Sequence, residues 1–263
     1  MHIDVDEYSR RVEAIGACTE VVPLRQAMMD ALALFGVSQA YFLAPLTRDT
    51  RVPRILTNWG MPWSWEKQYR ERLYQIDPLP LLVMDRPEPV YWPRDLAGAD
   101  LSVRQRRYLE IAAQYGMARG VGVACFAPAG RSGFLGAILP EGGDEPDAAD
   151  LRRIQSVGQT AFRVYCNIVQ YSETLPALSS REMEVLYWIS RGKSNSVIAE
   201  ILGISPSSVD VYVRRLFAKL DVTDRTTASV KAMSHGLLVS GEYERFVADQ
   251  RALQYGENPP RAD

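Results

Sequence analysis

Residues 178–228 read LSSREMEVLYWISRGKSNSVIAEILGISPSSVDVYVRRLFAKLDVTDRTTA. Ser179 lies three residues before Glu182, the spacing of a capping box, in which the two side chains accept from free backbone amides at a helix start. The apolar residues that follow recur at helical spacing, and Gly192 stands where a left-handed residue ends a helix. The stretch therefore begins with a short amphipathic helix.

Three further helix starts follow in the same stretch. Ser194 and Ser205 are N-cap residues, and Pro206 is a residue type favoured in the first helical turn. A fourth helix follows Asp224 and ends near the His235-Gly236 pair. Only a three-residue turn separates the second helix from the third, so the sequence predicts four helices with helix-turn-helix geometry.

Composition limits the classes of protein to consider. The chain has 263 residues, 30 Lys and Arg against 32 Asp and Glu, and 47% hydrophobic residues, which indicates a globular protein rather than a disordered or membrane-spanning one. The N-terminus MHIDVDEYSRR has no apolar segment, so we expect no signal peptide, no membrane association and a cytoplasmic protein. Three scattered cysteines and two histidines disfavour a disulfide framework, a metal centre and a Ser-His triad. We therefore expect no catalytic residues, no metal and no cofactor.

The charges are unevenly distributed. Residues 176–240 contain eight Lys and Arg against six Asp and Glu, whereas the segments on both sides carry an excess of acidic residues. A basic module between acidic segments favours a nucleic-acid contact confined to that module.

The first 170 residues mix helices and strands. Amphipathic helices are predicted at residues 22–35, 63–73, 102–115 and 148–171, and strands at residues 40–44, 54–57, 121–127 and 134–139. The last two strands are joined by PAGRSG, a loop that suits a β-hairpin. Because helices and strands do not alternate strictly, we expect an α+β fold, an α-β-α sandwich around an antiparallel sheet, followed by the four-helix domain.

Both parts resemble one family. The motif GKS-x-x-x-IA at residues 192–199 and the motif KL-x-V-x-x-R at residues 219–225 resemble the DNA-binding domain of LuxR-type transcription factors. The pattern Pro62-x-x-Trp65-x-x-x-Tyr69, then Asp77-Pro78 and Trp92, resembles the autoinducer-binding domain of the quorum-sensing branch, which binds N-acyl homoserine lactones. The resemblance implies an autoinducer-binding domain over residues 1–170, a linker over 171–178, a DNA-binding domain over 179–240, and a tail over 241–263 of unknown role.

The resemblance also implies a set of ligand-binding residues, whose chemistry fits. An N-acyl homoserine lactone offers one amide N–H donor, two carbonyl acceptors and an apolar chain, and a buried receptor must match each polar group. Asp77 is a charged acceptor for the amide, Trp65 is a donor for the lactone carbonyl, and flat walls come from Tyr69 and Trp92. The family usually has a Tyr four residues before the first Trp. Here that position is Met61, or Trp59 if Trp63 is the motif Trp, which favours an unusual acyl group.

On the recognition helix, the resemblance places Asp210 and Arg214 at base edges in the major groove. Arg214 suits guanine, and the Asp210 carboxylate would accept from a cytosine amine. Phosphate contacts are expected from the helix N-terminus and from nearby cations. These residues are Ser207, Ser208, Arg215, Lys193 and Lys219.

We expect a homodimer on a palindromic operator in double-stranded DNA, because one recognition helix spans too few base pairs to find its site alone. Each part has apolar residues that its own core does not require, and we expect the two copies to pair through them. These residues are Val230, Met233 and Leu237 in the fourth helix, and Val164, Ile168 and Tyr171 in the helix before the linker. RNA polymerase is a possible further partner.

Three alternatives stay open at this point. A phosphorylation-controlled response regulator would need an acidic pair after an N-terminal strand, and Asp4 and Asp6 follow none. A metal-dependent lactonase would need clustered histidines. The third alternative is a regulator that has lost ligand binding and works through protein contacts; Asp77 and Trp92 argue against it, and the absent motif Tyr favours it.

Overall fold

The computed structural model of the chain describes residues 3–48, 54–128, 130–169 and 177–238. They form two compact units, one drawn from residues 1–171 and the other mainly from residues 172–263. Each unit has its own hydrophobic core, so each is described by itself.

The N-terminal unit is built on one antiparallel sheet of five strands in the order β2-β1-β5-β4-β3. The strands are β1 (Gln39–Ala44), β2 (Ile55–Trp59), β3 (Val90–Trp92), β4 (Gly120–Ala127) and β5 (Arg131–Ile138). The predicted hairpin is the β4–β5 pair, whose register runs from Gly120 opposite Ile138 to Ala127 opposite Arg131. This pair forms the centre of the unit together with β1, which also pairs with β5.

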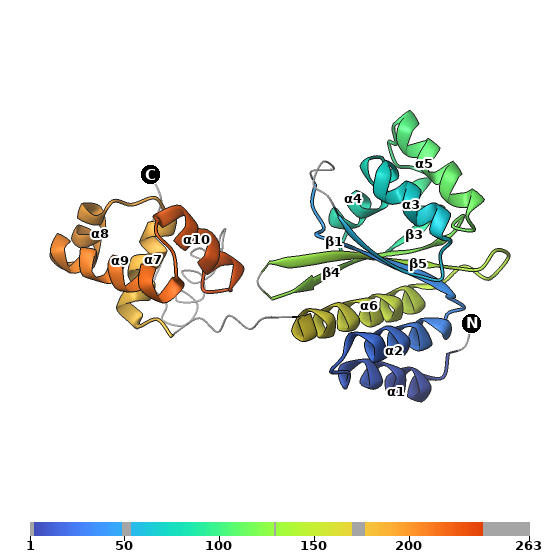
Figure 1. The fold of residues 1–263 in the computed structure, drawn as a ribbon, viewed down its shortest axis with the longest axis horizontal. Coiled ribbons are helices and arrows are strands. Elements are labelled where there is room, and N and C mark those ends of the chain that lie inside the picture. Colours follow the sequence, from blue (N-terminus) through green and yellow to red (C-terminus); the bar gives the residue numbers. More distant parts are fainter. Residues whose placement is uncertain (1–2, 49–53, 129, 170–176, 239–263) are drawn as a thin grey trace, which may run out of the picture. The chain divides into compact units, whose positions relative to one another are not determined.

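Helices cover both faces of the sheet (Figure 1). One face carries α1 (Val5–Gly16), α2 (Val21–Ala33) and α6 (Ala148–Val169). The other face carries α3 (Trp63–Glu71), α4 (Leu79–Met84) and α5 (Val103–Gln114), with short 3₁₀ turns at Leu73–Gln75 and Arg94–Leu96. The predicted α-β-α sandwich is therefore confirmed.

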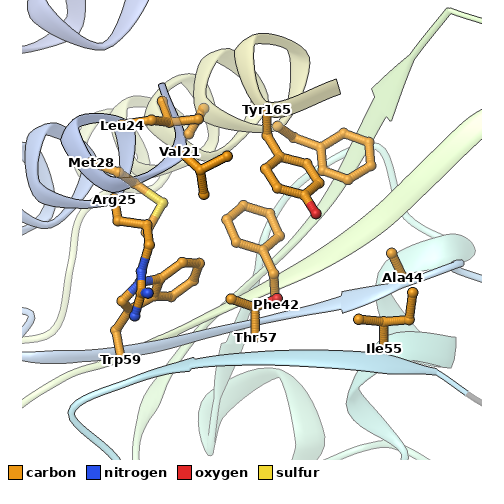
Figure 2. A pocket seen from close by; sticks show the side chains of 12 residues that line it. Val21, Leu24, Arg25, Met28, Phe42, Ala44, Ile55, Thr57, Trp59 and Tyr165 are labelled. Atoms are coloured by element: carbon orange, nitrogen blue, oxygen red, sulfur yellow. The ribbon is translucent and has the colours of Figure 1, made fainter. Parts of the chain in front are cut away.

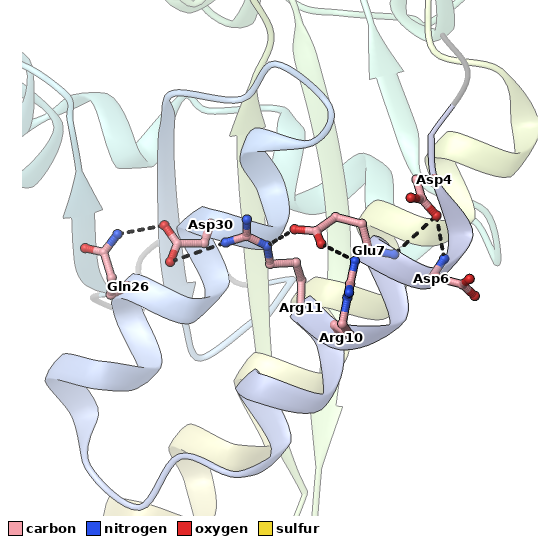
Figure 3. A network of polar contacts seen from close by, with 7 residues as sticks. All are labelled: Asp4, Asp6, Glu7, Arg10, Arg11, Gln26 and Asp30. Atoms are coloured by element: carbon pink, nitrogen blue, oxygen red, sulfur yellow. Dashed lines mark hydrogen bonds and ion pairs between the residues drawn. The ribbon is translucent and has the colours of Figure 1, made fainter.

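The helix α1 was not predicted, because its sequence is strongly charged. Its N-cap Asp4 accepts from the backbone N–H groups of Asp6 and Glu7, which satisfies two amides at the helix start. Figure 3 shows how polar groups then join α1 to α2: Glu7 holds Arg11 at 2.6 Å, and Arg11 lies 3.8 Å from Asp30. On its other side the helix buries Ile15 in the core.

The strand β1 separates two hydrophobic cores. Successive side chains of a strand point to opposite faces. Tyr41 and Leu43 lie in the core beneath α3, α4 and α5, whereas Ala40 and Phe42 lie in the core beneath α1, α2 and α6. The ring of Tyr41 lies flat against Gly136 of β5, where any Cβ would collide with it.

The C-terminal unit has the four helices that the sequence predicts, α7 (Ser180–Ser190), α8 (Asn195–Leu202), α9 (Pro206–Leu220) and α10 (Arg225–Ser234). Ser179, Ser194, Ser205 and Asp224 each cap one helix with a side-chain oxygen. Gly192 has a φ of +72°, the left-handed conformation expected at the end of α7.

Sequence patterns did not reveal β3 and α4, which have three and six residues. Such short segments show no period that distinguishes them from loops. The predicted linker core, the tail over residues 241–263 and Tyr171 lie outside the described residues. Within the described part of the chain, no single helix is long and apolar enough to span a membrane; only α8 and α9 taken together, bent by 110°, pass that test.

Candidate functional site

Asp77 is buried at the centre of the core beneath α3, α4 and α5, with 1% of its surface exposed. It lies between the Leu73–Gln75 turn and α4, and its Oδ1 accepts the backbone N–H of Leu79 at 3.0 Å. Its Oδ2 accepts the hydroxyl of Tyr69 at 2.8 Å. No cation forms an ion pair with this carboxylate in the described structure, so neutral donors hold it in place.

Aromatic rings surround this carboxylate. Trp65 and Tyr69 lie one turn apart on α3, with ring centroids 4.9 Å apart. Tyr41 of β1 lies 5.5 Å from the Trp65 ring, and Tyr108 of α5 lies 6.4 Å from the Tyr69 ring. We call these four aromatic residues and Asp77 together the Asp77 cluster: Tyr41, Trp65, Tyr69, Asp77 and Tyr108.

Three donors of the Asp77 cluster are buried without a hydrogen-bond partner of acceptable geometry: the Tyr41 hydroxyl, the Trp65 indole N–H and the Tyr108 hydroxyl. A buried donor without a partner costs about 1–3 kcal/mol, so such groups in one place indicate a binding role. Burial and then the charge of Asp77 raise the pKa of all three tyrosines of the cluster well above the usual value, so their hydroxyls remain protonated donors.

Burial also raises the pKa of Asp77, to about 6, although the Leu79 N–H and the Tyr69 hydroxyl act in the opposite direction. At neutral pH the carboxylate is therefore mainly ionised and can accept a hydrogen bond. Below pH 6 it becomes mainly protonated, so it no longer offers a charged acceptor and one of its oxygens becomes a donor.

Two other expected ligand residues belong to the same core. Met61 and Trp92 are buried there, and the Trp92 indole donates to the backbone carbonyl of Met117 at 3.1 Å. Trp92 thus serves as a wall held by the backbone. The Trp92 ring lies over Gly120, where a Cβ would collide with it.

Trp59 is placed differently from the other expected ligand residues. It packs against the core on the opposite face of the sheet, edge-on to Phe42 at 5.8 Å. The alternation of β2 sends its side chain away from the Asp77 cluster, so the site described here does not include it.

Sequence reasoning missed Tyr41 and Tyr108. Tyr41 alternates with Ala40 and Phe42 along β1, so its side chain must lie on the face opposite theirs. The alternation does not say which of the two faces that is. Tyr108 lies on α5, and only the packing of α5 against α3 brings it to Tyr69.

The exposed face of α9 carries most of the expected DNA contacts. Ser207, Asp210, Arg214 and Arg215 are exposed, and Ser208 is half-buried. The hydroxyl of Ser205 lies 2.9 Å from that of Ser207 and 2.8 Å from that of Ser208, so the N-terminus of α9 presents a group of hydroxyls.

Arg214 and Asp210 differ in the number of hydrogen bonds that their side chains make within the C-terminal unit. Arg214 makes one long contact, from Nε to the carbonyl of Asp210 at 3.4 Å, and its terminal guanidinium nitrogens have no partner within the described structure. Asp210 instead accepts from the side-chain amide of Asn195, which also accepts from Arg225. One carboxylate oxygen of Asp210 is therefore tied to the start of α8 rather than free for a base.

Lys219 differs from its predicted role as a phosphate contact. Its Nζ lies 2.7 Å from the buried Glu182 carboxylate and donates to the backbone carbonyl of Ala177 at 3.0 Å. Lys219 and the Ser179 cap hold the pKa of Glu182 below its ordinary value. This lysine therefore stabilises the C-terminal unit, and a role on DNA is not needed to explain it. Lys193, in contrast, is exposed.

The expected pairing faces are present only in part. On α10, Val230 and Met233 are exposed, as predicted. On α6, Val164 and Ile168 pack partly against the core, whereas the exposed apolar residues are Tyr165 and Val169. Val164 and Ile168 therefore contribute to the core of their own unit rather than to a face free for pairing, and pairing itself stays a prediction.

Two family descriptions match the chain. Residues 23–165 match "Autoinducer binding domain", and residues 176–232 match "Bacterial regulatory proteins, luxR family". The first match includes the Asp77 cluster, and the second includes α7, α8 and α9.

Individual proteins agree with these matches. The transcriptional activator protein AhyR of Aeromonas hydrophila is 27% identical over 194 residues, 71% of this chain and 75% of its own. The quorum sensing-dependent regulator RpaR of Rhodopseudomonas palustris is 26% identical over 205 residues, 76% of this chain and 82% of its own. The structure of Escherichia coli SdiA has the same fold, with a TM-score of 0.63 at 19% identity over 89% of this chain and 99% of SdiA.

We expect Asp77→Asn to change how the stability of the N-terminal unit depends on pH. Since the folded pKa of about 6 lies above the ordinary 3.8, the folded state holds the proton more tightly, and the wild type loses stability relative to the variant as pH rises from 4 to 6. Over this pH range the free energy of unfolding of the wild type should fall by roughly 3 kcal/mol relative to that of the variant. Urea unfolding followed by tryptophan fluorescence measures it, and a difference that stays constant with pH would contradict the assignment.

We expect Lys219→Met to destabilise the C-terminal unit by about 1–2 kcal/mol, because Glu182 loses its cation. The difference from wild type should be present at neutral pH and shrink as the medium is acidified through the lowered pKa of Glu182. Amide hydrogen exchange in α7 and α9 measures the effect. Lys193→Met is the matched control and should leave exchange unchanged; equal behaviour of the two variants would refute the structural role.

Proposed function

The chain belongs to the luxR family of bacterial regulatory proteins, and from that premise we propose that it is a transcriptional regulator controlled by an N-acyl homoserine lactone-type signal. The signal binds the Asp77 cluster of the N-terminal unit. The C-terminal unit binds an inverted-repeat site in double-stranded DNA, and the protein acts as a homodimer in the cytoplasm.

The observation that carries the proposal is the combination of one buried acceptor with several unpartnered buried donors. The Asp77 carboxylate supplies the acceptor, and the Trp65 N–H and the Tyr41 hydroxyl supply donors. An N-acyl homoserine lactone carries the complementary set, one amide N–H and two carbonyl groups. Binding would give partners to groups that the protein leaves without them, which is a strong source of specificity in a buried site.

Each group has a role in this proposal. Asp77 accepts from the ligand amide, and Trp65 donates to the lactone carbonyl. Tyr41, reaching the site from β1, donates to the acyl carbonyl in place of the Tyr that the family usually carries where this chain has Met61. The different direction of approach favours an acyl group of unusual shape, such as a branched or aryl one.

The DNA-binding half of the proposal rests on the exposed face of α9. Arg214 has free terminal nitrogens that suit the two acceptors of a guanine edge. Phosphates suit the exposed Lys193 and Arg215 and the serine hydroxyls at the start of α9.

Dimerisation follows from the exposed apolar residues and from the short reach of one helix. Val230 is 61% exposed and Met233 46% exposed on α10, and Val169 is 43% exposed on α6. Pairing through such residues would bury them and place two recognition helices on one inverted repeat. RNA polymerase is a further partner consistent with this role.

We expect Asp77→Asn to weaken binding of N-acyl homoserine lactones ten- to a hundredfold, since a buried charged hydrogen bond is worth roughly 1.5–3 kcal/mol. Tyr41→Phe should weaken it by about three- to tenfold, because it removes a buried hydroxyl that would donate to the acyl carbonyl. Calorimetric titration with a panel of short-chain, long-chain and aryl lactones measures both effects.

Asp100→Asn is the matched control, because Asp100 is exposed and outside the Asp77 cluster. It should bind as the wild type does. If no lactone of the panel binds the wild type, the ligand half of the proposal is wrong, and the chain is a regulator that acts through protein contacts.

We expect Arg214→Ala to cost about 1–3 kcal/mol at the cognate site and much less on random DNA. Lys193→Met should weaken both by a similar factor and reduce the salt dependence, because a phosphate contact carries no sequence information. Fluorescence anisotropy at several salt concentrations distinguishes the two variants. The division of roles fails if both variants lose the same factor on both DNAs.

A further inference from the structure

We propose that the N-terminal unit holds a second ligand site, on the face of the sheet opposite the Asp77 cluster, for a small monocarboxylate with an aromatic or short alkyl body. The site lies between α2, α6 and the strands β1 and β2. It is separate from the signal site of the proposed function and does not depend on that function.

A cavity of about 130 Å³ lies at this place. Figure 2 shows Phe42 of β1 in its middle, with Leu24 and Met28 of α2 on one side and Tyr165 of α6 on another. Because Phe42 and Tyr41 are neighbours in β1, their side chains point to opposite faces, and the body of the sheet separates this cavity from Asp77.

Two nitrogen-bearing side chains of the cavity, Arg25 and Trp59, lie together at one end, whereas the hydroxyls of Thr57 and Tyr165 lie elsewhere along it. The Arg25 guanidinium lies 5.3 Å from the centroid of the Trp59 ring, and Figure 2 shows the two side chains together. The indole N–H of Trp59 is buried and has no hydrogen-bond partner. Arg25 makes no hydrogen bond or ion pair within the described structure, and none of the residues that line the cavity is Asp or Glu.

This end suits a carboxylate. A guanidinium donates two parallel hydrogen bonds to the two oxygens of a carboxylate, and an indole can only donate. A cationic ligand would be repelled by the guanidinium, and a neutral one would gain no charge-assisted hydrogen bond from it. The two groups together therefore favour an anion with several acceptor lone pairs.

The rest of the cavity suits a compact apolar body. Its other walls are mainly aliphatic and aromatic, and Phe42 stacks on Phe162 of α6 at 5.9 Å. An apolar protein cavity of about 150 Å³ is known to hold benzene, so the volume here matches a single ring or a short alkyl chain. Two of the lining residues reach the surface, Arg25 and Ile55, which is 70% exposed, so a small molecule can enter.

Benzoate is the probe that tests the site, used with ¹⁵N-labelled full-length protein. The chain has five tryptophans, hence five indole N–H signals, and Trp59→Phe identifies the signal of Trp59. We expect benzoate to shift that signal in a saturable manner. Benzyl alcohol, which has a similar size and no charge, should bind at least fivefold more weakly.

Two Arg→Gln variants, one in the cavity and one outside it, test whether the Arg25 guanidinium binds the carboxylate. Arg25→Gln should weaken benzoate binding by about five- to tenfold, since it removes the cation at the polar end and leaves an exposed position that tolerates Gln. Arg104→Gln, an exposed arginine of α5 on the other face, should leave binding within twofold of the wild type. Asp77→Asn should also leave benzoate binding unchanged, which separates this site from the signal site.

Three results would overturn the proposal. The first is a benzoate-dependent shift of the Trp65 or Trp92 signal instead of the Trp59 signal. The second is equal binding of benzoate and benzyl alcohol, or equal binding by Arg25→Gln and Arg104→Gln. The third is a Trp59 signal that moves with protein concentration in the absence of benzoate, which would show that a second copy of the chain covers the cavity.

Discussion

Successive side chains of a strand point to opposite faces of its sheet, and in β1 this alternation sends Tyr41 towards Asp77 and Phe42 towards α6. The sheet is covered on both faces, so each side chain of β1 is committed to one of two cores. A slip of one residue in the pairing of β1 with β5 would exchange the two sets and move the Tyr41 ring off Gly136. The separation of the Asp77 cluster from the cavity beside Phe42 follows from this constraint.

Two buried carboxylates show how surroundings decide a role. Glu182 has a lysine at 2.7 Å and caps a helix, so its charge is compensated and its pKa is lowered. Asp77 has only neutral donors, and its pKa is raised to about 6. The first arrangement stabilises a fold, whereas the second holds a charge at a cost in stability. A costly buried charge among unpartnered donors is typical of a binding site.

The two units differ in how their sites are formed. The expected DNA-contacting face belongs to one helix, so it is present as soon as α9 folds and packs. The Asp77 cluster draws residues from β1, α3, α5 and the segment before α4, and it exists only when all of them pack on the sheet. A ligand that bridges such elements would stabilise the whole unit by mass action, which gives a physical route from ligand binding to a change in the protein's folded population.

The sequence by itself determined the features that depend on residues within about one helical turn of each other. The caps at Ser179, Ser194 and Ser205 and the stop at Gly192 are of this kind, and so are the family motifs around Asp77 and on α9. Periodicity predicted most strands and the longer helices except the strongly charged α1 for the same reason. Tertiary structure decided the rest: the face on which Trp59 lies, the arrival of Tyr41 and Tyr108 at Asp77, and the ion pair of Lys219 with Glu182, which are 37 residues apart. Such contacts depend on how separate elements pack, and a local pattern carries no information about distance between residues that are far apart in the chain.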